Sequence, residues 1–333
     1  MSTDRLNKPI HLEATLHAVL EVLAGAGTDT AAAHAGLDPA DLDAAIAVYQ
    51  QAGQHALAQQ AGPPAWRQLY VQFTDWDKAE QTAADHIAPV LDLAQQDELI
   101  TGWWFIRKHP CWRMRLLPAP GTQLPPALAD TLDELTADGR VHRWWPGIYE
   151  PEAAAFGGDI SMTIAHTLFH ADSRAILTTA HGELGRRELS LLLCATLMRA
   201  AGLEWYEQGD VWHRVTRERP LPPDVPAAKV HAMAGSVRQL LLADTSPTGP
   251  MLQSDRTLRP AADWVHAFHH AGTDLGTAAR AGTLDRGLRE VISYHVIFHW
   301  NRIGLPSRTQ SILAHAARTA ILHPIDSVER PTP

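Results

Sequence analysis

Residues 103 to 116 read WWFIRKHPCWRMRL, a pattern typical of two short strands joined by a tight turn at His109 and Pro110. Side chains on a strand alternate between its two faces, so Arg113 and Arg115 share one face and apolar side chains occupy the other. The guanidinium fork of arginine binds carboxylates through paired hydrogen bonds. The pattern therefore predicts an anion-binding strand. A solvated strand face with two surface arginines is the alternative that these residues leave open.

Composition places the chain among soluble globular proteins. It has 333 residues, of which 45% are hydrophobic and 20% are charged, enough for one large domain or two smaller ones. The formal net charge of −9 argues against a general basic surface that would coat nucleic acid. The chain has neither an apolar run long enough to cross a membrane nor a secretory signal at its N-terminus. We therefore expect a cytoplasmic protein that binds neither membranes nor nucleic acid directly.

Cysteine and histidine limit the metal chemistry that we expect. Two cysteines are too few for a disulfide framework or a cysteine-rich metal site. His166 and His170 are four residues apart, a spacing that can hold zinc, but the pair has no internal glutamate and no cysteine partner. We expect His170 instead to form a local hydrogen-bond network with Asp172 and Ser173 that shapes its helix.

Residues 1 to 60 are expected to form a small helical unit. Asp38 is suited to the N-cap of a helix, and the proline after it to the first helical position. The outline resembles a helix-turn-helix, but the acidic residues that follow Asp38 would repel phosphate, so we interpret the unit as a packing or docking element. The apolar stripe expected to face its core comprises Leu12, Leu16, Val19 and Leu23.

The middle of the chain predicts a β-α-β-β-α-β order. Strands are expected at residues 66–74, 103–108, 111–116 and 141–148, and helices at 75–94 and 127–137. This order favours a split, mostly antiparallel sheet with helices on one face. In the first of these helices, the residues expected to face a core are Ile87, Val90, Leu91 and Leu93.

From about residue 158 onward the pattern is helical. Helices are expected at residues 160–180, 185–201, 204–217, 226–242, 261–281, 285–303 and 309–322. The predicted fold class is therefore α+β, with a mostly antiparallel sheet followed by a large helical part and preceded by the small helical unit.

Two groups of residues outside the arginine strand could carry chemistry. His295, His299 and Arg302 are separated by four and three residues, so they lie on one face of a helix. A histidine pair beside an arginine can supply a general base with an electrostatic partner. Histidines that only pack or meet solvent are the alternative. Glu150 and Glu152 could act as acid–base groups or as ion-pair partners for the arginines.

Several of these motifs occur in the same order in a known family. They are Trp104-Phe-Ile-Arg-Lys, Trp112-Arg-Met-Arg-Leu, Tyr149-Glu-Pro-Glu, Phe156-Gly-Gly, Leu-Phe-His-Ala-Asp-Ser at residues 168–173, and Asn301-Arg302. From residue 66 to about 320 the chain resembles the thiopeptide-type bacteriocin biosynthesis family. That family is related to the C-terminal elimination domain of class I lantibiotic dehydratases, which we therefore expect over residues 66 to 325.

The resemblance implies a lyase that acts on a ribosomally made precursor peptide. A separate protein would attach glutamate from glutamyl-tRNA to Ser or Thr, and this chain would expel the glutamate to leave dehydroalanine or dehydrobutyrine in a lanthipeptide or thiopeptide. By this resemblance Arg113 and Arg115 clamp the anions. His299 transfers the proton, and Glu152 orients an arginine or shuttles the proton. The implied substrate-binding residues are Trp104, Arg107, Asn301 and Arg302.

The resemblance implies no metal and no organic cofactor. Its implied partners are the precursor peptide, with its leader and glutamylated core, and the glutamylation protein; a homodimer is a further expectation.

One position departs from the family pattern. Lantibiotic dehydratases carry an arginine directly before the aromatic-Gly-Gly motif, where this chain has Ala155. Either Arg107, Arg143 or Arg302 replaces that cation, or the chemistry differs. The different chemistry would be that of pyridine synthases of the same family, which join two dehydroalanines in a formal 4+2 cycloaddition and expel the leader peptide. A non-catalytic scaffold that binds the leader peptide is a third hypothesis.

Overall fold

The computed structural model describes residues 12–60, 66–120, 122, 124–179, 185–246, 249–253 and 258–322. Residues 9–11 and 180, which belong to predicted helices, lie outside this set. The chain divides into two compact units, residues 1–64 and 65–333.

The first unit consists of α1 (Leu12–Leu23), α2 (Thr28–Ala35) and α3 (Pro39–Gln60). The side chain of Asp38 accepts a hydrogen bond of 2.9 Å from the backbone N–H of Ala40. It thus satisfies one of the free N–H groups at the start of α3, as the sequence predicted for an N-cap.

The apolar stripe predicted on α1 is wrong as a description of this core. Leu12, Leu16 and Leu23 are 74%, 44% and 44% exposed, and of the predicted stripe only Val19 is buried. Small side chains let helices approach closely, so the helices pack through the alanine side of α1 and the leucines remain outside. The buried residues of this unit are Ala18, Val19, Ala31, Ala32 and Leu42.

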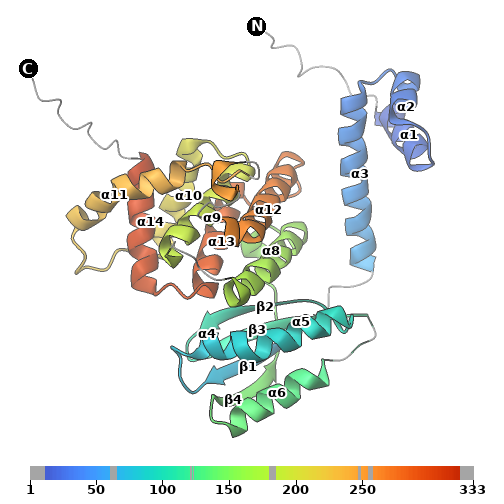
Figure 1. Ribbon diagram of the computed structural model, residues 1–333. Helices are drawn as coiled ribbons and strands as arrows, with labels where there is room; N and C mark the ends of the chain where they lie inside the picture. The colour runs from blue at the N-terminus through green and yellow to red at the C-terminus, as the bar shows by residue number, and fades with distance from the viewer. Residues whose placement is uncertain are drawn as a thin grey trace, which may run out of the picture. The chain divides into compact units, whose positions relative to one another are not determined.

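The second unit begins with a four-stranded antiparallel sheet in the order β2-β3-β1-β4. The strands are β1 (Arg67–Phe73), β2 (Ile100–Lys108), β3 (Cys111–Pro118) and β4 (Val141–Gly147). The crossovers contain α4 (Ala79–Thr82), a π-helical turn (Ala83–Ile87), α5 (Ala88–Gln96) and α6 (Pro126–Ala137). Figure 1 shows α5 and α6 lying across one face of the sheet. The predicted β-α-β-β-α-β order along the chain, the antiparallel sheet and the α+β class are confirmed.

One residue of the first crossover helix that was predicted to face the core does not. Ile87 and Leu91 are fully buried as predicted, but Leu93 is 53% exposed, so that part of the prediction is wrong. Leu93 follows Leu91 by two positions, which places it about 200° around the α-helix from the buried side.

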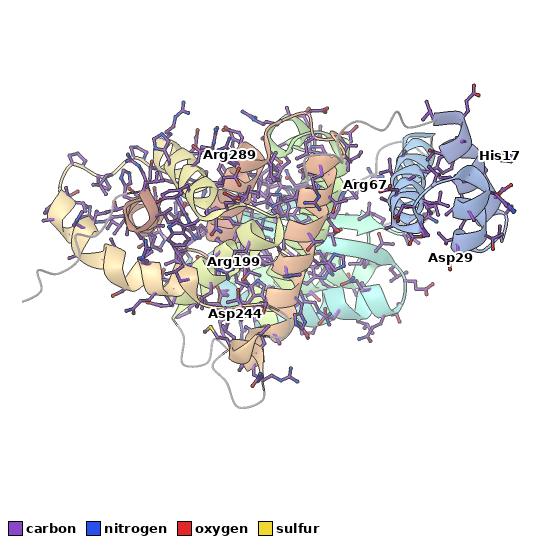
Figure 2. The ribbon with its side chains drawn as sticks, turned by 90° about the horizontal axis from the view of Figure 1, so that it is seen from above. His17, Asp29, Arg67, Arg199, Asp244 and Arg289 are labelled. Atoms are coloured by element: carbon purple, nitrogen blue, oxygen red, sulfur yellow. The ribbon has the colours of Figure 1, made fainter. Side chains whose placement is uncertain are left out.

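A short helix, α7 (Ala153–Phe156), leads into a layer of long helices that follows the predicted segments to within a few residues. These are α8 (Asp159–Thr178), α9 (Arg186–Ala200), α10 (Trp205–Glu218), α11 (Ala227–Leu242), α12 (Ala262–Arg280), α13 (Leu288–Arg302) and α14 (Ser307–Leu322). Arg199 of α9 donates to the carbonyl of Leu241, and Asp244 lies beside it (Figure 2). Among the described helices, none is both long and apolar enough to cross a membrane.

Helix α8 covers the outer edge of β2. Nδ1 of His170 lies 2.8 Å from the carbonyl oxygen of Trp103, and the hydroxyl of Ser173 accepts a hydrogen bond of 3.1 Å from the backbone N–H of Phe105. The free edge of the sheet is thus hydrogen-bonded to side chains. The predicted local network of His170 and Ser173 with Asp172 is wrong, because each finds its partner in another element. The prediction that helices cover only one face is also incomplete, since α8 and α13 pack against β2.

Candidate active site

The sheet places the two arginines of β3 on one face, as predicted, but in different environments. Arg115 lies opposite Gln68 and Trp104 on the neighbouring strands, and Arg113 lies opposite Tyr70. Arg115 is 3% exposed. Arg113 is half-buried, with its guanidinium carbon 5.6 Å from the centre of the Tyr70 ring. The alternative of two surface arginines is therefore wrong for Arg115.

The guanidinium of Arg115 is held by rings and an amide. Its carbon lies 4.1 Å from the ring centre of Trp104 and 4.5 Å from that of Tyr149. Its Nε donates a hydrogen bond of 3.0 Å to Gln68, whose amide donates in turn to the carbonyl of Ile148. Its Nη1 is buried and has no hydrogen-bond partner among the described residues. This N–H group is therefore free to bind an anion.

Burial lowers the pKa of Arg115 to about 10, while the neighbouring Tyr149 and Glu152 act in the opposite direction. Arg115 thus keeps its charge at neutral pH. Glu152 follows β4 and precedes α7, and its buried Oε2 has no hydrogen-bond partner among the described residues. A carboxylate and an arginine, each with an unused hydrogen-bonding atom, therefore lie near each other at this end of the sheet.

A histidine that the sequence did not single out for this site lies beside Arg115. Nε2 of His166 is 2.8 Å from the hydroxyl of Tyr149, and its ring centre is 4.6 Å from that of Trp66. Burial, aided by the charge of Arg115, lowers the pKa of His166 to about 4. The imidazole is therefore neutral at physiological pH.

An aromatic cluster connects this region to the helices. The ring of Trp104 lies 4.7 Å from that of Phe169 of α8, and Phe169 lies 5.3 Å from Phe156 of α7. The guanidinium carbon of Arg302 lies 4.1 Å from the ring centre of Phe169. Arg115 and Arg302 therefore flank one set of rings, and Trp104 and Phe169 separate them.

Behind this cluster lies a buried ionic network formed by α8 and α13. Asp172 accepts a hydrogen bond of 2.6 Å from Nε of Arg302, and its two oxygens lie 3.0 and 3.1 Å from Nδ1 of His299. Trp264 also donates to Asp172, at 2.8 Å. The side chains of Asp172, His299 and Arg302 are fully buried. Burial alone would raise the pKa of Asp172, but His299 and Arg302 outweigh that effect and lower it.

Several polar atoms of this network have no partner among the described residues. They are Nη1 and Nη2 of Arg302, Nε2 of His299, and both ring nitrogens of His295. His295 packs against Phe156 at 4.9 Å, and burial together with the charge of Arg302 lowers its pKa to about 3. Buried polar atoms without partners are uncommon in proteins, so those of Arg302 and His295, which contact the rings of Phe169 and Phe156, are candidates to bind a polar ligand.

The paired glycines after Phe156 allow the loop before α13 to pack against α7. A Cβ atom at Gly158 would lie 2.3 Å from a carboxylate oxygen of Asp285, and Gly157 accepts a hydrogen bond of 2.9 Å from the backbone N–H of Asp285. Both glycines also have positive φ angles, of 85° and 97°. Close approach and left-handed backbone thus both require glycine here.

Two predicted substrate-binding residues have other partners. Arg107 forms an ion pair with Glu80 and donates a hydrogen bond of 2.7 Å to the carbonyl of Arg302. Glu80 also pairs with Arg186, so these residues hold the C-terminal end of α13. Asn301 accepts a hydrogen bond of 3.0 Å from Gln310 of α14. The structure therefore brings Arg113, Arg115, Trp104, Glu152 and Arg302 to the aromatic cluster or the sheet face beside it, and it gives Arg107 and Asn301 contacts within the fold. His299 lies behind the cluster, against Asp172 and the rings of Trp264 and Phe268.

The sequence contained a signal for one residue that it did not identify. Asp172 falls in the stripe of α8 that also carries Phe169 and Ile176, and a carboxylate among apolar neighbours on a helix face predicts a buried partner. Nothing local could have identified Tyr149 and His166, because their contact depends on how β4 leads into α7 and α8. Within the described ranges, His, Cys, Asp and Glu side chains form no group of three or more that could hold a metal ion.

Comparison with known proteins places this geometry in a family. The family described as "Lantibiotic biosynthesis dehydratase C-term" matches residues 66–321. The chain belongs to this family. The description of the family assigns its members to lantibiotic biosynthesis.

A solved structure of similar fold is the tRNA-dependent lantibiotic dehydratase MibB from Microbispora sp. 107891. The two share 22% identity with a TM-score of 0.59, over 79% of this chain and 28% of the MibB chain. This chain therefore spans less than a third of the length of MibB. No curated protein matches the chain.

Within this dehydratase family, Ala155 occupies the position where an arginine is expected. Ala155 packs against the Trp104–Phe169 cluster. Of the arginines considered as replacements, Arg107 pairs with Glu80, Arg302 pairs with Asp172, and Arg143 lies over the ring of Trp145 on β4. Arg286 lies beside α7, where it donates a hydrogen bond of 3.3 Å to the carbonyl of Ala154.

Proposed function

We propose that this domain eliminates glutamate from glutamylated Ser or Thr residues of a precursor peptide. A base removes the α-proton of the modified residue, and the bond between its β-carbon and the ester oxygen breaks. The electron pair of the C–H bond becomes the new double bond, and glutamate leaves as a carboxylate. The products are dehydroalanine from Ser and dehydrobutyrine from Thr. Negative charge develops on the substrate carbonyl oxygen and on the leaving group, so the reaction needs fixed cations.

The observation that carries this proposal is the buried guanidinium of Arg115. It retains its charge, no carboxylate bonds to it directly, and its Nη1 is unused. A preorganised donor of this kind stabilises a developing anion more strongly in a water-excluded site than in water. Arg113, on the same face, supplies a second and more accessible cation.

We assign the removal of the proton to His299. Its Nδ1 lies against the carboxylate of Asp172, which favours the tautomer with the proton on Nδ1 and leaves the lone pair of Nε2 to accept a proton. Arg302 is bound to the same carboxylate and provides a further fixed cation on the other side of the aromatic cluster. Glu152, with its unused oxygen, accepts the proton from the base or orients Arg115.

The substrate can reach Arg115 only if the cover over it moves. Tyr149 contributes one of the rings over the guanidinium, and it lies in the segment 148–152, which has no regular secondary structure. We therefore expect this segment to be displaced when a modified residue binds. This movement breaks the hydrogen bond between the hydroxyl of Tyr149 and His166, together with the contacts of the Tyr149 ring with Trp104 and Arg115.

An assay with chemically glutamylated precursor peptide tests the proposal. The wild-type protein should reduce the peptide mass by one glutamic acid for each modified site. Arg115→Ala and His299→Gln should leave the glutamylated peptide to accumulate, whereas Arg217→Ala, which alters an exposed arginine of α10, should react as the wild type does. Elimination at the wild-type rate by both site variants would overturn the assignment.

One observation favours a second candidate function. Ala155 places a methyl group against an apolar cluster at the position where the resemblance leads us to expect an arginine, and this suits binding of uncharged dehydroalanines in a pyridine synthase. Incubation with an already dehydrated peptide separates the two functions. Cyclisation with release of the leader peptide supports the synthase. If the protein binds the glutamylated peptide and the dehydrated peptide but changes the mass of neither, a non-catalytic scaffold is supported.

For the elimination function, a separate glutamyl-tRNA-dependent protein is the proposed partner that supplies the glutamylated peptide. The match of residues 66–321 to the C-terminal dehydratase family supports this proposal. Co-expression of the precursor with this chain alone should leave the peptide unmodified, and addition of a glutamylating protein should restore dehydration.

A further inference from the structure

A strip of arginines and aromatic rings extends from Arg113 across the part of the sheet that lies away from β2. We define the arginine–aromatic strip as Arg113 of β3, Tyr70 of β1, and Trp145 and Arg143 of β4. The guanidinium of Arg113 lies over the ring of Tyr70. Tyr70 stacks on Trp145 with ring centres 5.2 Å apart and an interplanar angle of 11°, and the guanidinium of Arg143 lies 4.7 Å from the Trp145 ring.

The strand register fixes this arrangement. Trp145, Tyr70 and Arg113 are direct neighbours across β4, β1 and β3, so their side chains project from the same face. Gly147 leaves room for the Tyr70 ring, since a Cβ atom there would lie 2.4 Å from it. The amide oxygen of Gln72 accepts a hydrogen bond of 3.0 Å from Nε of Arg143. Ring stacking and this hydrogen bond therefore order the strip without any bound partner.

The charge of the strip is uncompensated. Among the described residues, neither Arg113 nor Arg143 forms an ion pair with a carboxylate, although the chain as a whole has a net charge of −9. Arg143 is exposed, and Tyr70, Trp145 and Arg113 are each partly exposed. An ordered cationic surface on an acidic protein is complementary to an acidic partner.

We propose that the arginine–aromatic strip binds an acidic, extended segment of the peptide substrate and directs the adjoining residues toward Arg115. Neighbouring strands are about 4.8 Å apart, so the two guanidinium groups are separated by on the order of 10 Å, the length of roughly three extended residues. The segment that fits carries two acidic side chains three or four positions apart, with apolar groups between them over the rings. This inference rests on the proposed action on a peptide.

Stacked rings and arginines can also bind single-stranded nucleic acid. Two observations favour a peptide. The overall negative charge repels a polyanion outside the strip, and the proposed reaction takes place on a peptide. A nucleic acid ligand is therefore an outcome of the test rather than a second proposal.

Fluorescence anisotropy with the full chain tests the proposal. The probe is a short fluorescein-labelled peptide with a pair of glutamates four positions apart among leucine and serine residues. Arg143→Glu and Trp145→Ala should each weaken its binding by about tenfold or more. Arg217→Glu makes the same charge change at an exposed position on α10 and should bind as the wild type does. A matched peptide with glutamines in place of the glutamates should bind about tenfold more weakly than the acidic probe.

The proposal is overturned if Arg143→Glu and Arg217→Glu bind the acidic peptide equally, or if the glutamine peptide binds as tightly as the acidic one. It is also overturned if a single-stranded oligouridine binds in an Arg143-dependent manner and the peptide does not. The elimination assay on the wild-type protein is a separate readout. Elimination without strip-dependent binding refutes only the strip, and strip-dependent binding without elimination refutes only the proposed reaction.

Discussion

Two arginines of this protein are buried to nearly the same extent, but their charges are handled differently. Arg302, in the helical layer, bonds to the carboxylate of Asp172. Arg115, on the sheet, bonds to the neutral amide of Gln68 and lies between two rings. A buried ion pair fixes its members, because removing either partner leaves an uncompensated charge. No carboxylate bonds to Arg115, so its charge is left for a ligand. The comparison indicates that in the first centre Asp172 fixes Arg302 and orients the proposed proton acceptor His299, whereas the second centre, Arg115, binds an anion.

The largest effect is expected where the carboxylate is removed. Asp172→Asn leaves Arg302 charged, buried and without its counterion, so the free energy of unfolding should fall by about 3 to 5 kcal/mol. Urea denaturation measures the loss. Asp224, whose pair with Arg308 is on the surface, provides the control, and Asp224→Asn should leave stability unchanged within error. Equal losses in the two variants would contradict the distinction between a buried pair and a surface pair.

Removal of the Arg115 side chain should lower the rate of elimination more than it lowers the stability of the fold. Arg115→Ala should raise the elimination barrier by about 3 kcal/mol, a rate loss of about 100-fold, because one anion-stabilising donor is lost. Its denaturation midpoint should change less than that of Asp172→Asn, since no carboxylate is left unpaired. Single-turnover mass spectrometry and urea titration on the same preparations give both quantities. If stability falls as far as in Asp172→Asn, Arg115 is a structural residue.

A third variant gives Arg115 the kind of partner that Arg302 has. In Gln68→Glu the new carboxylate replaces the amide 3.0 Å from Nε of Arg115 and should pair with it. Elimination should slow by about tenfold or more relative to the wild type and to Gln68→Leu. Both variants lose the hydrogen bond from the Gln68 amide to the carbonyl of Ile148, so stability is compared between the two variants. Gln68→Leu is the matched control, because it removes the hydrogen bond without adding a charge. A Gln68→Glu protein that eliminates at the wild-type rate would show that compensation of charge is not what separates the two centres.

The most gradual effect concerns pH and His295, which packs near the first centre. Its pKa is about 3 in the folded protein, against 6.5 for a free imidazole, because burial and then Arg302 oppose protonation. The unfolded chain therefore takes up a proton at a higher pH than the folded one. The folded state is favoured by this difference in pKa. The resulting contribution to the free energy of unfolding is fully present above pH 6.5 and is lost as the pH falls toward 3. In urea titrations over this interval His295→Leu should show a shallower decline than the wild type.

The exposed His231 serves as the control for that experiment. His231→Leu should decline with pH as the wild type does. A decline that His295→Leu leaves unaltered would assign the acid sensitivity to other groups.

The sequence by itself determined the elements and their order. Alternation in the arginine strand and helical periodicity elsewhere depend on neighbours within a few residues, so the strands, the helices and the shared face of Arg113 and Arg115 could be predicted locally. Only the tertiary structure decided which arginine is buried and which carboxylate meets His299. Asp172 and His299 are 127 positions apart, and their contact depends on how α8 packs against α13. The exposed leucines of α1 have the same cause: periodicity identifies an apolar face, but the packing partner decides whether that face is covered.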